Sequence, residues 1–109
     1  MNESIGLRIK QKTVNASVIK ILRRYGSESI SELTRNIKEE KYVKEVSYFE
    51  EEEIKELIRC SEELIKEGVE IELYEDERKC SIDYLKNLVK TYESISSDDD
   101  SGLNSLYNL

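Results

Sequence analysis

One stretch of the chain constrains the fold more than any other, because a helical pattern passes directly into a strand pattern across a single glycine. From about residue 49 to 67, one helical stripe contains Ser61 and the apolar residues Ile54, Leu57, Ile58, Leu64 and Ile65. Gly68 supplies a stop, since glycine readily adopts the left-handed conformation that ends helices. Residues 69–74 then alternate apolar and polar side chains, as does a strand with one buried face. The chain is therefore predicted to mix helices and strands.

A further strand and a short helix are predicted at the start of the chain. Residues 5–10 alternate apolar and polar side chains, which indicates a strand. Asn15 is suited to cap a helix that continues with amphipathic spacing to Tyr25. Gly26 stands where a left-handed residue is expected after the end of that helix.

A second helix and another strand follow. Ser29 and Glu32 have the spacing of a capping box, in which the serine side chain and the glutamate side chain each bind the backbone of the other. The helix that they open carries Ile30, Leu33 and Ile37 on one side. Residues 41–48 hold two valines and two tyrosines and are predicted as a short strand.

The last part of the chain is predicted as a turn, a helix and a tail. Residues 75–79 form a charged turn, and Ser81 caps a fourth helix over 82–95. The composition of 96–109 is that of a flexible acidic tail, so residues 1–95 make up the single predicted domain. The apolar stripe of 82–95 has to cover a sheet edge, pack beside another helix or pair with a second copy. Both a monomer and a homodimer therefore stay open.

The order of these elements resembles the C-terminal domain of the bacterial ribosomal stalk protein, whose fold is shared with the Clp-protease adaptor. The resemblance covers about residues 4–75 and rests on the segments VIKILR, early in the chain, and ELIKEGVEIEL, late in it. It implies an α/β (α+β) fold in which helices cover a three-stranded sheet. The implied order is β-α-α-β-α-β, followed here by an extra C-terminal helix.

The resemblance also implies a function for the first helical hairpin. In stalk proteins this hairpin offers basic residues to translation GTPases, and Lys20 and Arg23 are the matching positions. The chain departs from a genuine stalk within this hairpin as well as in its extra C-terminal helix. The segment SESIS replaces a glycine- and leucine-rich turn, and Thr34 stands where a lysine is expected.

The implied fold makes the first and third strands neighbours. Arg8 and Lys10 would then lie near Glu70 and Glu72 on the polar face of the sheet. Opposite charges placed across from each other on neighbouring strands contribute about 0.2–1 kcal/mol per pair. We therefore expect a solvated, charge-paired outer face.

Charge is distributed unevenly along the sequence. The net charge is −7, but residues 1–41 carry nine basic and five acidic side chains, whereas residues 42–109 carry eight and nineteen. A net +4 is thus followed by a net −11. Such asymmetry fits a protein-binding surface, a nucleic-acid surface or ordinary solvated helices.

Several classes of function are disfavoured by the residues present. The chain has no histidine and only Cys60 and Cys80, so we expect neither an activated nucleophile nor a zinc site. No glycine-rich phosphate-binding motif occurs, and the aspartates at 98–100 lack the spacing of a calcium loop. We therefore predict that the chain is not an enzyme and holds no cofactor or metal.

Nucleic acid and membranes are disfavoured as partners for other reasons. The acidic remainder of so small a domain repels a polyanion at Debye distances of about 10 Å, which outweighs the basic first helix. The sequence shows neither an apolar run long enough to span a bilayer nor a secretion signal. We therefore expect a cytoplasmic protein that binds another protein.

Two protein-binding functions remain. The first is an immunity-type inhibitor that neutralises a basic, nuclease-like toxin through its acidic face, Glu70, Glu72, Glu75, Asp76 and Glu77. The alternative is a stalk-like or adaptor-like module that recruits a translation or protease factor through Lys20, Arg23 and Arg24. The apolar residues after the acidic stretch form either a short docking motif or a frayed end; they are Leu103, Leu106, Tyr107 and Leu109.

Overall fold

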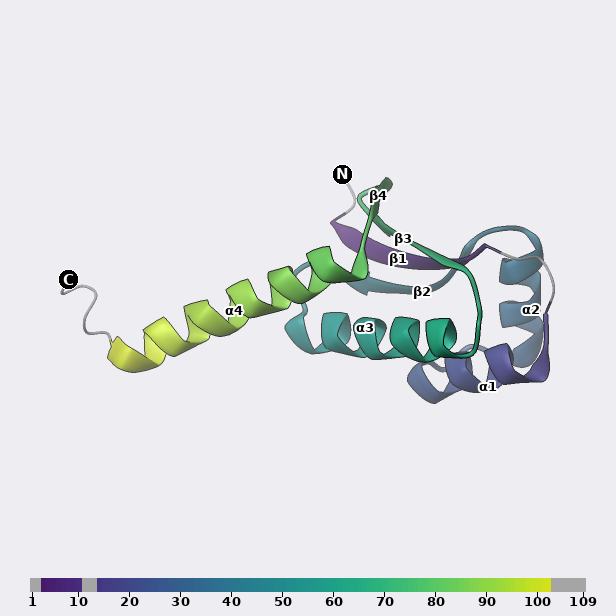
Figure 1. Cartoon of the computed structure of the whole chain (residues 1–109), viewed down its shortest axis with the longest axis horizontal. Helices are drawn as coiled ribbons and strands as arrows, with labels where there is room; N and C mark the ends of the chain where they lie inside the picture. The colour runs from purple at the N-terminus through teal and green to yellow at the C-terminus, as the bar shows by residue number, and fades with distance from the viewer. Residues whose placement is uncertain (1–2, 11–13, 103–109) are drawn as a thin grey trace.

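Four antiparallel strands form one sheet, with helices packed against one of its faces (Figure 1). A computed structural model describes residues 3–10 and 14–102. The order across the sheet is β2-β1-β3-β4, so that the first strand is central. The strands are β1 (Ser4–Ile9), β2 (Tyr42–Ser47), β3 (Ile71–Glu75) and β4 (Arg78–Cys80). The helices are α1 (Ala16–Tyr25), α2 (Ile30–Lys38), α3 (Glu51–Lys66) and α4 (Ile82–Gly102).

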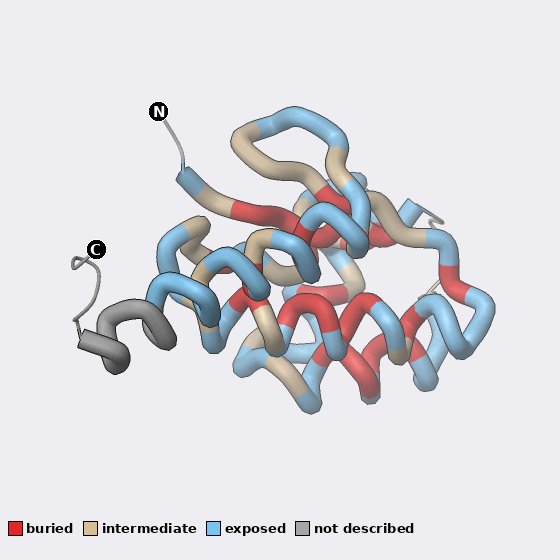
Figure 2. Tube along the Cα trace, turned by 60° about the vertical axis from the view of Figure 1, so that its left-hand side comes forward, coloured by how far each residue is buried: buried red, intermediate tan, exposed pale blue. Residues whose placement is uncertain are grey.

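The core lies between the sheet and the helices. Ile5, Leu7 and Ile9 of β1 are all but inaccessible to solvent, and Figure 2 shows the buried stretch of this strand in red close to the N-terminus. They pack with side chains from all four helices, and α3 supplies Ile54, Leu57 and Leu64 without any exposed surface. Burial of one such side chain stabilises the fold by about 1.5–3 kcal/mol.

Three helix starts have the predicted side-chain caps. Asn15 Oδ1 accepts a hydrogen bond from the Val18 amide at 3.0 Å. Ser81 Oγ accepts one from the Tyr84 amide at 3.1 Å. The capping box before α2 is complete, because the Glu32 amide donates to Ser29 Oγ at 3.1 Å and the Ser29 amide donates to Glu32 Oε1 at 3.0 Å. Each cap satisfies backbone groups that the helix itself leaves unpaired.

Two glycines that were both predicted to end helices behave differently. Gly68 has φ +83°, the left-handed conformation expected after α3. Gly26 instead has φ −150°, so its predicted left-handed conformation is wrong. Lys44 Nζ donates to the Tyr25 carbonyl at 2.7 Å and thereby satisfies a carbonyl at the end of α1. That side chain takes over part of the role that a left-handed glycine would have filled.

The prediction of mixed helices and strands is confirmed, but the three-stranded sheet is wrong. Residues 75–79 were predicted as a turn, yet β3 and β4 pair across them, with Glu75 opposite Arg78. Only Asp76 and Glu77 form the turn, with φ values of 52° and 70°. A two-residue hairpin turn with both central φ angles positive usually contains glycine or asparagine. Neither is present here, which is why the sequence pattern missed the fourth strand.

The fourth helix is longer than predicted and packs beside α3. It runs to Gly102, beyond the predicted end at 95, whereas residues 103–109 of the predicted tail lie outside the described residues. Leu85 and Val89 are buried against the core. Lys86 pairs with Glu62 at 2.7 Å, and Lys55 pairs with Glu93 at 3.2 Å. These pairs show that α4 is antiparallel to α3, so the second of the three predicted placements is correct.

Candidate functional site

The helical hairpin of α1 and α2 leaves a hollow on its surface. The inner face of α1 packs Val18, Ile21 and Leu22 into the core. The shorter α2 buries only Leu33 and Ile37. Because α2 contributes so little apolar surface, part of the space between the two helices stays open to solvent.

This hollow has an apolar floor and a cationic rim. Its volume is about 610 Å³, within the usual range for binding pockets. Ile19 lies in its floor, and the side chain of Ile30 is 54% exposed beside it. We call this hollow the hairpin groove; it is lined by Val14, Asn15, Ala16, Ile19, Lys20, Arg23, Ile30 and Thr34.

The exposure of Ile30 corrects its predicted position. The spacing of Ile30, Leu33 and Ile37 predicted that all three would share the buried side of α2. Leu33 and Ile37 are fully buried, whereas Ile30, in the first turn of α2, faces the hairpin groove. Contiguous apolar surface with a polar rim is typical of an interaction site, and Ile30 adds apolar surface to the hollow that Ile19 and the cations line.

A second hollow continues the hairpin groove along α2. It has a volume of about 620 Å³ and shares Ile30 and Thr34 with the groove. Its lining adds Ser31, Glu39 and the cations Arg35 and Lys38, for which the sequence pattern predicted no role. Their spacing along one helix was the available signal, since residues three apart lie close together on a helix surface.

The cations of this region are not neutralised by the fold. Lys20, Arg23, Arg35 and Lys38 are exposed, and none of them forms an ion pair with a carboxylate in the part of the chain that the structure describes. Arg24 differs, because it pairs with Glu63 of α3 and joins the two helices. The structure therefore brings Lys20 and Arg23 together and separates Arg24 from them.

The predicted acidic face contains one residue that the fold already uses. Arg8 Nε donates to Glu72 Oε1 at 3.1 Å, Tyr74 Oη donates to the same oxygen at 3.0 Å, and Lys79 pairs with Glu72 at 3.4 Å. The hydrogen bond from Arg8 is the main reason why the pKa of Glu72 is lowered to about 2. Arg8 lies directly opposite Glu72 across β1 and β3, as predicted. The Glu72 carboxylate is therefore already paired with cations of the same sheet.

The other predicted acids are spread along and beyond β3. Glu70 precedes β3, where its carbonyl accepts from the Lys10 amide at 2.9 Å. Burial raises the pKa of the Tyr84 hydroxyl in α4, and the nearby Glu75 carboxylate adds to this shift. Asp76 and Glu77 lie at the tip of the β3–β4 turn. The five carboxylates are thus divided between the sheet, the side near α4 and the turn.

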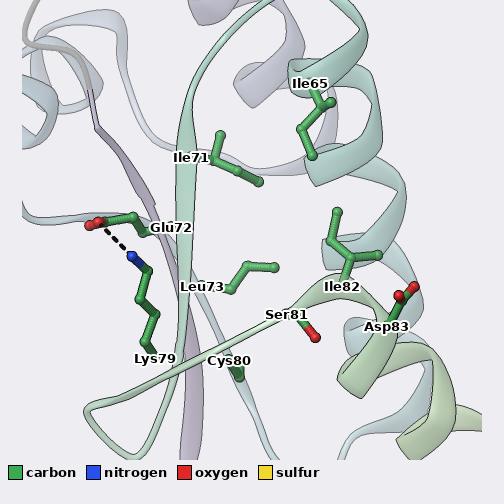
Figure 3. A pocket seen from close by; sticks show the side chains of 9 residues that line it. All are labelled: Ile65, Ile71, Glu72, Leu73, Lys79, Cys80, Ser81, Ile82 and Asp83. Carbon is green, nitrogen blue, oxygen red and sulfur yellow. Dashed lines mark ion pairs between the residues drawn. The ribbon is translucent and has the colours of Figure 1, made fainter.

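A smaller hollow lies between α3, β3 and the start of α4 (Figure 3). Its volume is about 290 Å³, and the side chains of Ile65, Ile71 and Ile82 surround it. Glu72 and Lys79 point away from it on the other side of the sheet (Figure 3). Ile65 was predicted within the buried stripe of α3 but is 49% exposed, because it lies over this gap.

Both cysteines are free and carry neutral thiols at physiological pH. Burial raises the pKa of Cys60 to about 12 and that of Cys80 to about 11. A thiol reacts as a nucleophile or metal ligand through its thiolate, so neither cysteine is activated. Among residues 3–10 and 14–102, no group of three or more potential ligand side chains is arranged to hold a metal ion.

No protein-family model, curated protein or solved structure matches this chain. The resemblance to the ribosomal stalk domain therefore stays a prediction from the sequence. In the described part of the chain, every helix is too short or too polar to cross a bilayer. The hairpin groove is the candidate functional site, since it combines exposed apolar surface with cations that have no carboxylate partner within residues 3–10 and 14–102.

Proposed function

We propose that this chain is a non-enzymatic, cytoplasmic protein-binding module that recruits a partner protein through the hairpin groove. The observation that carries the proposal is the juxtaposition of exposed Ile30 with Lys20 and Arg23 around one open hollow. A charged side chain that has no partner within the fold gives up no internal ion pair when it binds another molecule. The groove therefore suits a short segment that carries both acidic and apolar residues.

The two parts of the groove have different roles in this proposal. Burying the exposed surface of Ile30 supplies affinity, at about 25 cal/mol per Å² of apolar area removed from water. Lys20 and Arg23 select acidic segments and speed the encounter, since charge complementarity contributes to specificity and association rate more than to affinity. Arg35 and Lys38 extend the same positive region along α2.

The sequence resemblance supports the same hairpin. A stalk-like or adaptor-like module would engage a translation or protease factor at Lys20 and Arg23. Both residues line the groove, whereas Arg24, the third cation of the prediction, is paired with Glu63. The proposal therefore rests on Lys20 and Arg23 and leaves Arg24 in a structural role.

An immunity-type inhibitor of a basic toxin is the second candidate. It is favoured by the exposed turn between β3 and β4, which presents Asp76 and Glu77 in a chain with a net charge of −7. Glu72 is a poor member of this surface because Arg8 and Lys79 already hold it. The inhibitor would therefore depend on the turn more than on the outer face of the sheet.

A capture experiment separates the two candidates. The tagged chain and its variants are incubated with lysate from the native host, and bound proteins are identified by mass spectrometry. We expect a partner that is lost with Lys20→Glu/Arg23→Glu but kept with Arg59→Glu/Lys90→Glu, which makes the same change in net charge at exposed positions elsewhere.

The second candidate predicts the opposite dependence. Asp76→Lys/Glu77→Lys would abolish capture of a basic protein, and Lys20→Glu/Arg23→Glu would leave it unchanged. That pattern would overturn the groove proposal. Capture that is insensitive to all three double variants would overturn both.

A further inference from the structure

We propose that the hairpin groove binds residues 98–109 from a second copy of this chain, so that the protein associates head to tail. The inference rests on the proposed function, because it names an acidic and apolar segment that the groove would hold. It differs from that function in making the chain its own partner.

The sequence of the segment complements the groove. Residues 98–100 are three consecutive aspartates, and the apolar residues Leu103, Leu106, Tyr107 and Leu109 follow within nine positions. The groove has the opposite pattern, in which Lys20 and Arg23 stand beside the apolar surface of Ile19 and Ile30. Acidic side chains can meet the rim while apolar side chains cover the floor.

The shape of the molecule argues against binding of the segment to its own groove. The longest dimension of the molecule is 55 Å, and α1 and α2 lie near one end of it, whereas α4 leads toward the other (Figure 1). The antiparallel pairing of α4 with α3 fixes this direction. The seven residues after Gly102 span at most about 25 Å when fully extended. A second copy is therefore the source of the segment.

The symmetry of such a contact determines the assemblies that can form. The groove of one copy and the segment of the next are different surfaces, so the contact is heterologous. Repetition yields a ring if the rotation closes and an open chain if it does not. Self-association should consequently increase with concentration and weaken with salt, because it joins opposite charges at the surface.

Sedimentation velocity of the full-length chain tests the proposal. At 50 mM salt, we expect the weight-average sedimentation coefficient to rise as the concentration increases from about 10 μM to 1 mM. Lys20→Glu/Arg23→Glu should weaken association at least tenfold, and so should Asp98→Asn/Asp99→Asn/Asp100→Asn. The matched control Arg59→Glu/Lys90→Glu should associate like the unmodified chain.

Mixing the two weakened variants gives the decisive result. The groove variant keeps an intact segment, and the segment variant keeps an intact groove, so the mixture should form a complex of one copy of each and nothing larger. Circular dichroism verifies that each variant is folded. A monomer at all concentrations, or a mixture that does not associate, would overturn the proposal.

Two further outcomes separate this inference from the proposed function. Capture of another protein through the groove, without self-association, would refute the inference and leave the function intact. Association that survives both variants but is lost with Phe49→Ser/Ile95→Ser would assign the contact to the exposed apolar residues near α3 and α4 instead. That result would also overturn the inference.

Discussion

The hairpin groove and the outer face of the sheet both carry charged side chains, but only the sheet neutralises them internally. On the sheet, Arg8 contacts Glu72 and Tyr74, and its guanidinium lies 5.1 Å from the centre of the Tyr74 ring. In the groove, Lys20 and Arg23 have no carboxylate partner among the described residues. A charge count along the sequence treats Glu72 and the groove cations alike, whereas the structure shows that Glu72 is already paired with Arg8 and Lys79.

Packing on the outer face gives the largest expected effect. A Cβ atom at Gly6 would lie 2.6 Å from the ring of Tyr42, which covers this glycine. Gly6→Ala should therefore displace the ring and lower the free energy of unfolding by about 1–3 kcal/mol. Urea denaturation followed by circular dichroism measures the loss.

The double variant Gly6→Ala/Tyr42→Ala identifies the cause. Removing the ring removes the clash. Gly6→Ala should therefore lower the free energy of unfolding much less in the Tyr42→Ala background than in the unmodified chain. Equal costs in both backgrounds would show that the ring does not constrain position 6.

Arg8→Met should produce the next largest effect. It removes the main donor to Glu72, whose side chain is 11% exposed, and should lower the free energy of unfolding at pH 7 by about 1–2 kcal/mol. The same substitution at the hairpin, Lys20→Met, should change the free energy of unfolding by no more than about 0.5 kcal/mol, because Lys20 is exposed and forms no ion pair in the part of the chain that the structure describes. Equal losses would contradict the contrast between the two regions.

The effect of Arg8→Met should also depend on pH. The folded state lowers the pKa of Glu72 to about 2, whereas an ordinary glutamate has a pKa of about 4.3. The stabilisation is therefore complete above the ordinary pKa and is lost as the pH falls toward 2. The difference between the unmodified chain and Arg8→Met should shrink over this window in urea titrations. A constant difference would show that Arg8 acts through packing and not through its charge.

Glu77→Gly should stabilise the protein slightly. Glu77 has φ 70°, which strains a residue with a Cβ atom, and glycine removes that strain. Glycine also raises the entropy of the unfolded chain, so the expected gain is about 0.5–1 kcal/mol. Arg78→Gly, one residue later in β4, should be destabilising instead, since its backbone is extended. Thermal denaturation should show a higher midpoint temperature for Glu77→Gly and a lower one for Arg78→Gly than for the unmodified chain.

The smallest expected effect concerns the groove cations and gives the sharpest test of their role. Lys20→Glu/Arg23→Glu should change the free energy of unfolding by less than about 0.5 kcal/mol. Arg24→Glu should cost more, about 0.5–1 kcal/mol, because it replaces the ion pair with Glu63 by a repulsion. If the groove variant were the less stable, Lys20 and Arg23 would be structural residues.

Local signals predicted much of the fold. Asn15, Ser29 and Ser81 each cap a helix as expected, because a cap depends on residues only three positions apart. Alternation also located β1, because Ile5, Leu7 and Ile9 on one face of this strand are buried in the core. Features determined by neighbours in sequence were thus accessible without the structure.

Features that depend on residues far apart in the sequence could not be predicted from the sequence. Gly26 is not left-handed, and Lys44 reaches the Tyr25 carbonyl at the end of α1 from β2 instead. The fourth strand was missed because the turn at Asp76 and Glu77 uses positive φ values without glycine. Both outcomes depend on tertiary contacts that outweigh local preference.

The candidate site was predicted only in part for the same reason. Lys20 and Arg23 were selected from the sequence, but Ile30 was assigned to the core and Arg35 and Lys38 were not considered. The sequence also offered two incompatible roles for Glu72, one paired with Arg8 and one facing a partner. The register between β1 and β3 favours the first role.

The central position of β1 has a consequence for synthesis. This strand pairs with β2 on one side and β3 on the other, and Ile9 is opposite Ile71. At about 5–20 residues per second, β1 is made roughly 3–12 s before the strand that completes its pairing. Until β3 has been made, at least one edge of β1 is unpaired and its apolar face is incompletely covered. The sheet therefore closes late in translation, and any chaperone that protects the nascent chain would act on its earliest strand.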